Sequence, residues 1–332
     1  MNFSRLLAVS LIVMTITYSC RKDDPFEPDA EVTFGIRHDK SLSDYEAAAT
    51  STSGDVPNFS AVISLDYSLD GSDNYQYTAT GTLINNEWIL TAGHNFFSAD
   101  EDSSPASASG IRVLVGNDPN NPVSTHLVSN MVLHPTWLAG DQEYADANDL
   151  CLLKLSTPVS NVAAAALCTT KTENIGSKVW FCGYGDYSSL QGQDPDLLSK
   201  RHAMENVLDR KRDGLNTSAG GTTYNGGLLA FDFDSPDENV NSLGDDFVGT
   251  DEADLGSGDS DAQALDLEGT SVEGDSGGPL FIKIGNQWVL AGVLSGGADA
   301  PIADFEDSSY GDISIFTRVS SHIDWINSVI QP

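Results

Sequence analysis

The sequence predicts an all-β protein with one helix at its carboxyl end. Short runs of alternating apolar and polar residues, rich in Val, Ile, Thr, Tyr and Phe, recur along the chain between Gly, Asn and Asp turns. Helical patterns do not alternate with these runs, which favours barrels over a parallel sheet. With 332 residues, of which 40% are hydrophobic, the chain is long enough to bury a substantial core.

The expected strands follow one another from residue 59 onward. We expect one strand in each of the runs 59–67, 75–84, 87–92, 111–115, 126–133, 149–155, 178–184, 280–284, 288–294 and 313–319. After the last run, Val319, Ile323, Ile326 and Ile330 fall on one face of a helix. This helix is expected to place its apolar face on the strands.

The first residues have the features of a secretory signal peptide. Arg5 precedes an apolar run at 6–18 that is too short to span a membrane, so we expect residues 1–19 to be removed. The run ends T-Y-S-C, which resembles a bacterial lipoprotein processing box and makes Cys20 the expected lipidation site. The alternative is ordinary cleavage near Ser19 with an unmodified cysteine. We expect an exported lipoprotein of the outer membrane or cell surface, or otherwise a periplasmic or extracellular protein.

Residues 20–54 are expected to form the polar tether of the lipid anchor, or a pro-segment that is cut away. Residues 55–330 form the main domain, with an acidic insertion at about 186–269. Carboxylates at that density are able to hold calcium, but their spacing is not that of an EF-hand loop. Solvated acidic loops, with no metal and no other cofactor, are therefore favoured. Within the insertion, residues 200–207 are a candidate strand that returns to the second barrel.

The formal net charge is −33 at pH 7. Such acidity repels nucleic acids and anionic lipid surfaces, so neither is expected as a partner. Membrane attachment would then depend on the N-terminal lipid alone, and we expect a monomer.

The stretch that carries the chemistry is E-G-D-S-G-G-P-L at 273–280, which places Ser276 in a glycine-rich bend before an apolar run. The amides of Gly274 and Ser276 are candidates for binding an oxyanion, because glycines allow the backbone to approach a substrate closely. A serine hydroxyl is a weak nucleophile and needs an imidazole base that a carboxylate orients. L-T-A-G-H-N supplies His94, and N-D-L-C-L-L-K-L supplies Asp149.

These three blocks, in the order His, Asp, Ser, resemble the chymotrypsin/trypsin-like serine protease family from about Val56 to Ile330. The resemblance implies two six-stranded antiparallel β-barrels with a C-terminal helix. It also implies a catalytic triad of His94, Asp149 and Ser276.

The resemblance assigns a supporting role to Asp275. In the family, a newly cut N-terminus that begins with Ile pairs with this aspartate and orders the oxyanion hole. Cleavage before Ile36 would produce such an N-terminus here. The alternative is that Asp275 is satisfied internally without activation.

The same resemblance outlines a substrate pocket. Thr270, six residues before the nucleophile, takes the base of the pocket, Ser295 and Gly297 its wall, and Ser314 its far side. A neutral pocket favours an uncharged residue before the scissile bond. The alternative is that Asp312 points inward and selects basic residues.

Three cysteines remain after Cys20. Cys168 and Cys182 are able to pair in an oxidising compartment, whereas Cys151, inside an apolar run, is expected to be a small buried hydrophobe.

The function that fits these features is a membrane-anchored serine endopeptidase that acts on protein or peptide substrates. Two alternatives stay open: a catalytically silent surface lipoprotein that uses the scaffold for binding, and an esterase-like acyl hydrolase.

Overall fold

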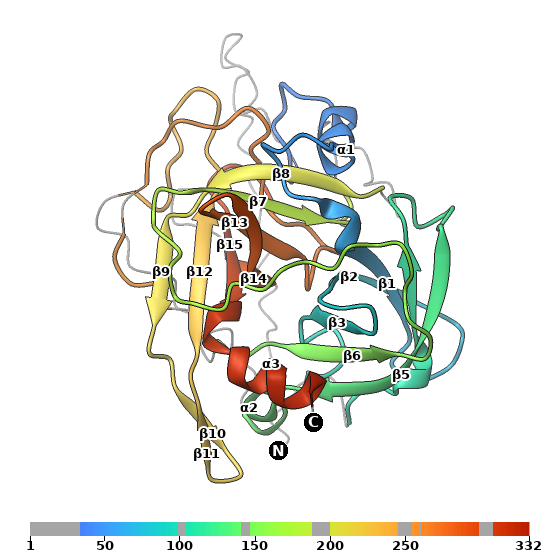
Figure 1. The fold of residues 1–332 in the computed structure, drawn as a ribbon. Coiled ribbons are helices and arrows are strands. Elements are labelled where there is room, and N and C mark those ends of the chain that lie inside the picture. The colour runs from blue at the N-terminus through green and yellow to red at the C-terminus, as the bar shows by residue number, and fades with distance from the viewer. Residues whose placement is uncertain are drawn as a thin grey trace, which may run out of the picture. The chain divides into compact units, whose positions relative to one another are not determined.

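The strands of this computed structural model form a closed barrel, a seven-stranded sheet and a two-stranded ribbon (Figure 1). The structure describes residues 34–98, 104–140, 147–187, 200–244, 254–258, 260–298 and 308–331. The strands are β1 (Val62–Tyr67), β2 (Tyr77–Leu83), β3 (Trp88–Thr91), β4 (Ile111–Val115), β5 (Ser124–Leu133), β6 (Cys151–Leu155), β7 (Lys178–Gly183), β8 (His202–Val207), β9 (Arg210–Asp213), β10 (Thr217–Ala219), β11 (Thr222–Tyr224), β12 (Gly227–Asp232), β13 (Pro279–Ile284), β14 (Gln287–Ala298) and β15 (Ile313–Arg318). The helices are α1 (Leu42–Ala49), α2 (Pro135–Ala139) and α3 (Ile323–Ile330), with 3-10 turns at Phe59–Ala61, Ala108–Gly110 and Val319–Ser321. Each run expected to be a strand contains one, and the C-terminal helix is confirmed.

The closed barrel has the strand order β1-β2-β3-β6-β5-β4, and all neighbouring strands are antiparallel. Successive side chains of a strand point to opposite faces. In β1, Ile63 therefore lies in the barrel interior, while Val62 packs in a cluster shared with the second sheet. In β3, Ile89 likewise lies in the barrel interior, and Leu90 packs in the cluster shared with the second sheet. Consecutive apolar residues thus fill two cores, one inside the barrel and one between the barrel and the sheet.

One of the two predicted barrels is found, and the second is not closed in the part of the chain that the structure describes. The second set of strands forms an open antiparallel sheet in the order β8-β7-β13-β14-β15-β12-β9. Its two edges, β8 and β9, are consecutive in the chain and are separated by Leu208 and Asp209. The Leu208 amide donates to the carbonyl just before β7, whereas the Asp209 amide donates to a carbonyl of β12. The chain therefore passes at these two residues from pairing at one edge of the sheet to pairing at the other.

The strand expected at residues 200–207 is β8, but the rest of the acidic insertion is not a set of solvated loops where the structure describes it. The insertion also supplies β9 to β12, and it buries the carboxyl groups of Asp209, Asp232, Asp234 and Glu268. Within the described residues, no group of three or more His, Cys, Asp or Glu side chains could hold a metal ion. Parts of the insertion, at 188–199, 245–253 and 259, lie outside those residues.

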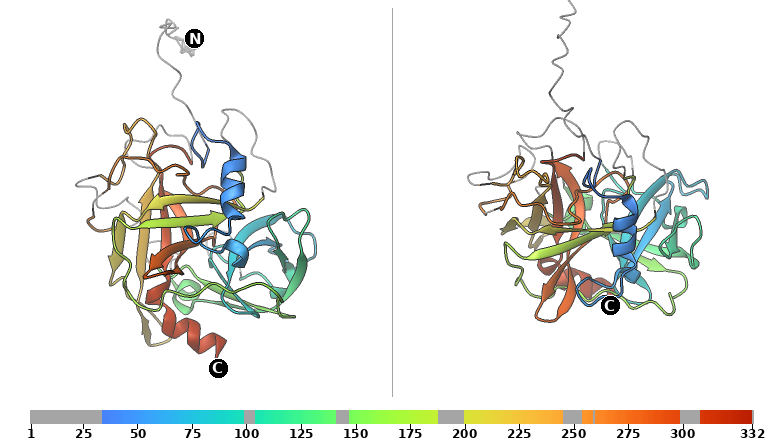
Figure 2. Two further views of the ribbon diagram at one scale, coloured as in Figure 1. Left: turned by 45° about the horizontal axis from the view of Figure 1, so that its top comes forward. Right: turned by 90° about the horizontal axis from the view of Figure 1, so that it is seen from above.

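Folded structure begins upstream of residue 55, in the segment expected to be a tether. Helix α1 lies against β8, as both views of Figure 2 show, and its Tyr45 is fully buried. At the other end of the chain, Trp325 and Ile326 of α3 pack into the core between barrel and sheet. Among the described helices, none is both long enough and apolar enough to cross a membrane.

The three cysteines that the structure describes are free, buried thiols. Cys168 packs in the core of the second sheet, whereas Cys182 faces the core shared with the barrel. The pairing considered for these two residues is therefore not formed. Cys151 lies in the barrel interior, as expected for a small apolar residue.

Candidate active site

The ends of three strands bring His94, Asp149 and Ser276 together. His94 follows β3 and Asp149 precedes β6, and these two strands are neighbours in the barrel. Ser276 precedes β13 of the second sheet, and its carbonyl accepts a hydrogen bond of 2.9 Å from the Thr80 amide in β2. The site therefore lies where the barrel meets the sheet.

The three side chains form one line of hydrogen bonds. His94 Nδ1 lies 2.6 Å from Asp149 Oδ2, and His94 Nε2 lies 2.8 Å from Ser276 Oγ. A carboxylate only accepts, so Nδ1 carries a proton, and Nε2 of the neutral imidazole accepts from the Ser276 hydroxyl. Burial opposes a charge on His94, but the charge of Asp149 and the hydrogen bond to it raise the pKa of His94 above its ordinary value. The arrangement supplies a base that is stabilised once it holds the serine proton.

Asp149 is fully buried and is held by two residues besides the His94 ring. Its Oδ1 accepts from the amides of Gly93 (2.6 Å) and His94 (2.8 Å), and its Oδ2 accepts from Ser295 Oγ (2.7 Å). Ser295 had been expected on the wall of the substrate pocket. A bulge in β14 shifts the register there and turns the Ser295 hydroxyl toward Asp149 instead.

The loop before β13 presents two backbone amides that are free to bind a ligand. In the part of the chain that the structure describes, the amides of Gly274 and Ser276 donate no hydrogen bond, whereas those of Asp275, Gly277 and Gly278 all donate to carbonyls. Gly277 has φ +84°, and a Cβ there would collide with β2 and with a β3 side chain, so the loop requires glycine. The two free amides match the predicted oxyanion hole in position.

Asp275 is fully buried beside the nucleophile. Its carboxylate accepts from the amides of Gly185 (2.9 Å) and Val272 (3.1 Å) and from the Tyr187 hydroxyl. Burial raises the pKa of Asp275 to about 7, against the lowering effect of these three donors. No local sequence pattern links Tyr187 to a partner so distant in the chain.

A cavity of about 370 Å³ opens beside Ser276 on the side of the second sheet. Thr270, Gly297 and Asp312 are among the residues that line it. Ser314 lies behind the lining: it is fully buried, and its Oγ is 2.9 Å from Thr270 Oγ1. The lining of the cavity therefore contains both the neutral hydroxyl group of Thr270 and the carboxyl group of Asp312.

A second cavity of about 540 Å³ opens on the barrel side of Ser276. Its lining includes Tyr67, Tyr75 and Tyr77, and the guanidinium of Arg112 lies 4.4 Å from the ring centre of Tyr75. Sequence analysis did not identify this cavity. Together, the two cavities leave room for a chain on both sides of the nucleophile.

Comparison with known proteins gives this geometry a context. The family model described as Trypsin matches residues 55–228. Transmembrane protease serine 11C of Mus musculus is 27% identical over 266 residues, which cover 77% of this chain and 48% of that protein. Transmembrane protease serine 5 of Homo sapiens is 25% identical over 264 residues, which cover 77% of this chain and 47% of that protein. The chain thus spans about half the length of these curated relatives.

Proposed function

Since the chain belongs to the trypsin family, we propose that it is a serine endopeptidase that hydrolyses peptide bonds through an acyl-enzyme intermediate. The observation that carries the proposal is the line of hydrogen bonds from Ser276 through His94 to Asp149. Two free amides and a cavity on each side of the nucleophile support it further.

In the proposed reaction, His94 Nε2 takes the proton of Ser276 Oγ as this oxygen attacks the substrate carbonyl. The amides of Gly274 and Ser276 bind the oxyanion that forms. His94 then returns its proton to the leaving amine, and water repeats the sequence on the acyl-enzyme. Asp149 keeps the ring in the required tautomer and stabilises its charged form throughout.

The pocket beside Ser276 decides which residue precedes the scissile bond. We propose an uncharged residue, because Thr270 and Ser314 bond to each other at a neutral surface. The observation that favours a basic residue instead is the presence of Asp312 in the lining. Cut sites in a mixed peptide library, compared between wild type and Asp312→Asn, distinguish the two preferences.

We further propose that the protein is exported and held at a membrane, as a monomer, by a lipid on Cys20. The apolar run at 6–18 and the T-Y-S-C sequence support this proposal. Residues 1–33 lie outside the described residues. Incorporation of a labelled fatty acid into the full chain, and its loss in Cys20→Ser, tests the anchor.

The endopeptidase is tested by labelling with a fluorophosphonate probe together with digestion of the peptide library. We expect stoichiometric labelling of Ser276 that is lost in Ser276→Ala and falls by several orders of magnitude in His94→Ala. His126, which bonds to Thr157 on the barrel surface, provides a control, and His126→Ala is expected to label normally. Labelling with ester turnover but no peptide cleavage would identify an acyl hydrolase, and ligand capture without labelling a binding protein.

A further inference from the structure

The segment Phe34–Lys40 precedes the region that matches the trypsin family, yet it is built into the folded domain. The Gly35 carbonyl accepts a hydrogen bond of 2.9 Å from the Thr270 amide. Ile36 forms an antiparallel bridge with Gly269 and is fully buried. The peptide bond between Gly35 and Ile36 is therefore part of the structure that leads to the substrate pocket.

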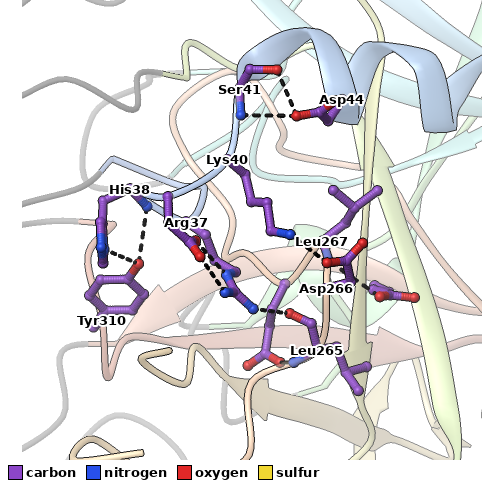
Figure 3. Close-up of polar contacts among 12 residues, drawn as sticks. Arg37, His38, Lys40, Ser41, Asp44, Leu265, Asp266, Leu267 and Tyr310 are labelled. Atoms are coloured by element: carbon purple, nitrogen blue, oxygen red, sulfur yellow. Dashed lines mark hydrogen bonds and ion pairs between the residues drawn. The ribbon is translucent and has the colours of Figure 1, made fainter. Parts of the chain in front are cut away.

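Side chains fix the same segment in place (Figure 3). The guanidinium of Arg37 donates to the Leu265 carbonyl over 2.6 Å and pairs with Asp39 at 2.7 Å. Lys40 forms an ion pair with Asp266. These contacts tie the segment to the chain just before the base of the pocket.

Gly35 lies directly on Tyr187, whose hydroxyl donates to Asp275. The φ of Gly35 is +79°, and a Cβ there would collide with the Tyr187 ring and with Val272. The ring also packs edge-to-face against His202 and is almost fully buried. The position of Tyr187 is thus fixed by the backbone of the upstream segment.

The connection continues into the reacting centre. Asp275 lies between Gly274 and Ser276 in the chain, and its buried carboxylate accepts from the Val272 amide of the same loop, so it anchors the loop that carries the two free amides. Phe34, at the start of the segment, lines the cavity beside Ser276. One stretch of chain therefore supports the oxyanion loop and also contributes to the pocket.

We propose that residues 34–40 are a permanent, uncut part of the active site, in which Gly35 holds Tyr187 and Tyr187 holds Asp275. The enzyme is then active without cleavage at Ile36. Tyr187 is a positioning residue: it does not touch the substrate and acts through the carboxylate that it orients. This inference rests on the proposed endopeptidase function.

The first test is the mass of the labelled enzyme. The full chain is treated with the fluorophosphonate probe, and intact-mass and peptide analysis then locate the N-terminus of every labelled molecule. We expect labelled chains that still carry residues 34–40. Labelling confined to chains cut within 34–40 would overturn this inference and leave the endopeptidase standing, whereas no labelling of any form would contradict the endopeptidase itself.

The second test isolates the Tyr187 hydroxyl. We expect Tyr187→Phe to lower kcat by about 10- to 100-fold with KM changed less than about 2-fold, because the oxyanion donors lose alignment while the pocket is kept. Tyr184→Phe is the matched control, because it removes a buried hydroxyl that bonds to the carbonyls of Val62 and Gly116. A similar drop in melting temperature is expected for both variants, with a loss of kcat in Tyr187→Phe alone. Equal kcat values would overturn the role of Tyr187, and if Tyr187→Phe does not fold, the mass measurement decides alone.

Discussion

Asp234 makes the stability of the protein dependent on pH in a direction unusual for an aspartate. Its side chain is 5% exposed, and burial together with the charges of Asp232 and Glu268 raises its pKa from 3.8 to about 9. A raised pKa means that the folded state holds the proton more tightly than the unfolded state. The stability present at low pH is therefore lost as pH rises from the ordinary pKa toward the folded one.

The variant Asp234→Asn keeps the shape of the neutral carboxyl and removes the titration. Between pH 5 and pH 7 the unfolded aspartate is ionised and the folded one is not, so the wild type loses about 1.4 kcal/mol per pH unit relative to the variant. We therefore expect the difference in unfolding free energy between variant and wild type to grow by about 3 kcal/mol over these two pH units. Urea unfolding at the two pH values measures it.

Asp237→Asn is the matched control, because Asp237 belongs to the same acidic run and is exposed. Its substitution is expected to change the unfolding free energy by no more than about 0.5 kcal/mol at either pH. If Asp234→Asn shows the same difference from wild type at pH 5 and at pH 7, Asp234 is ionised in the folded protein and the reasoning is wrong.

Three further predictions concern the site and its support. Ser295→Ala removes a donor to the Asp149 carboxylate and is expected to lower kcat/KM by about 10-fold, as steady-state kinetics would reveal. Thr270→Asp adds a carboxylate to the lining of the cavity beside Ser276. The preference for Lys and Arg at the cut sites of a peptide library is expected to rise by about 10- to 100-fold, because one hydrogen bond to a charged group contributes free energy of that size. Glu173→Gln leaves the fully buried guanidinium of Arg318 without its buried partner and is expected to cost about 3 kcal/mol in urea unfolding at pH 7. Burial opposes ionisation of Glu173, but the ion pair with Arg318 lowers the pKa of Glu173 below its ordinary value. The stability that the ion pair contributes is therefore present above the ordinary carboxyl pKa and is lost as pH falls through the lowered pKa of the folded state. A cost of Glu173→Gln that is the same at pH 3 as at pH 7 would contradict this prediction.

The sequence was most informative where the candidate catalytic residues lie next to the end of a strand. His94, Asp149 and Ser276 each adjoin an apolar run, and once these runs are strands, their ends meet where the barrel adjoins the second sheet. The structure brings the three side chains within hydrogen-bonding distance. Short motifs therefore sufficed to locate the candidate triad.

Features that depend on irregular backbone were not predictable. The bulge in β14 turns the Ser295 hydroxyl toward Asp149, and at Leu208 and Asp209 the chain passes from one edge of the second sheet to the other. Gly296 and Gly297 permit the bulge but do not set its register, and Leu208-Asp209 contains no Gly or Pro. Both therefore required the register of the sheet to be known.

The burial of carboxyl groups in the acidic insertion was not predictable for a different reason. Asp232 and Asp234 follow the apolar run G-L-L-A-F and alternate with phenylalanines, but they also open the acidic sequence D-F-D-S-P-D-E-N, and acidic sequences are normally solvated. In the folded protein these groups are buried because β12 passes through the core. Burial favours the protonated, neutral form of a carboxyl group over its ionised form. Tyr187 was missed because its role depends on Gly35, a residue far away in the chain.

The candidate triad is divided between the two halves of the domain, with the base and its carboxylate on the barrel and the nucleophile on the second sheet. Neither half alone holds the complete candidate triad. A chain that has folded only one half therefore lacks the assembled site on which the proposed endopeptidase activity depends. The triad is assembled only when the core between the halves forms, so that folding itself would control the onset of the proposed activity.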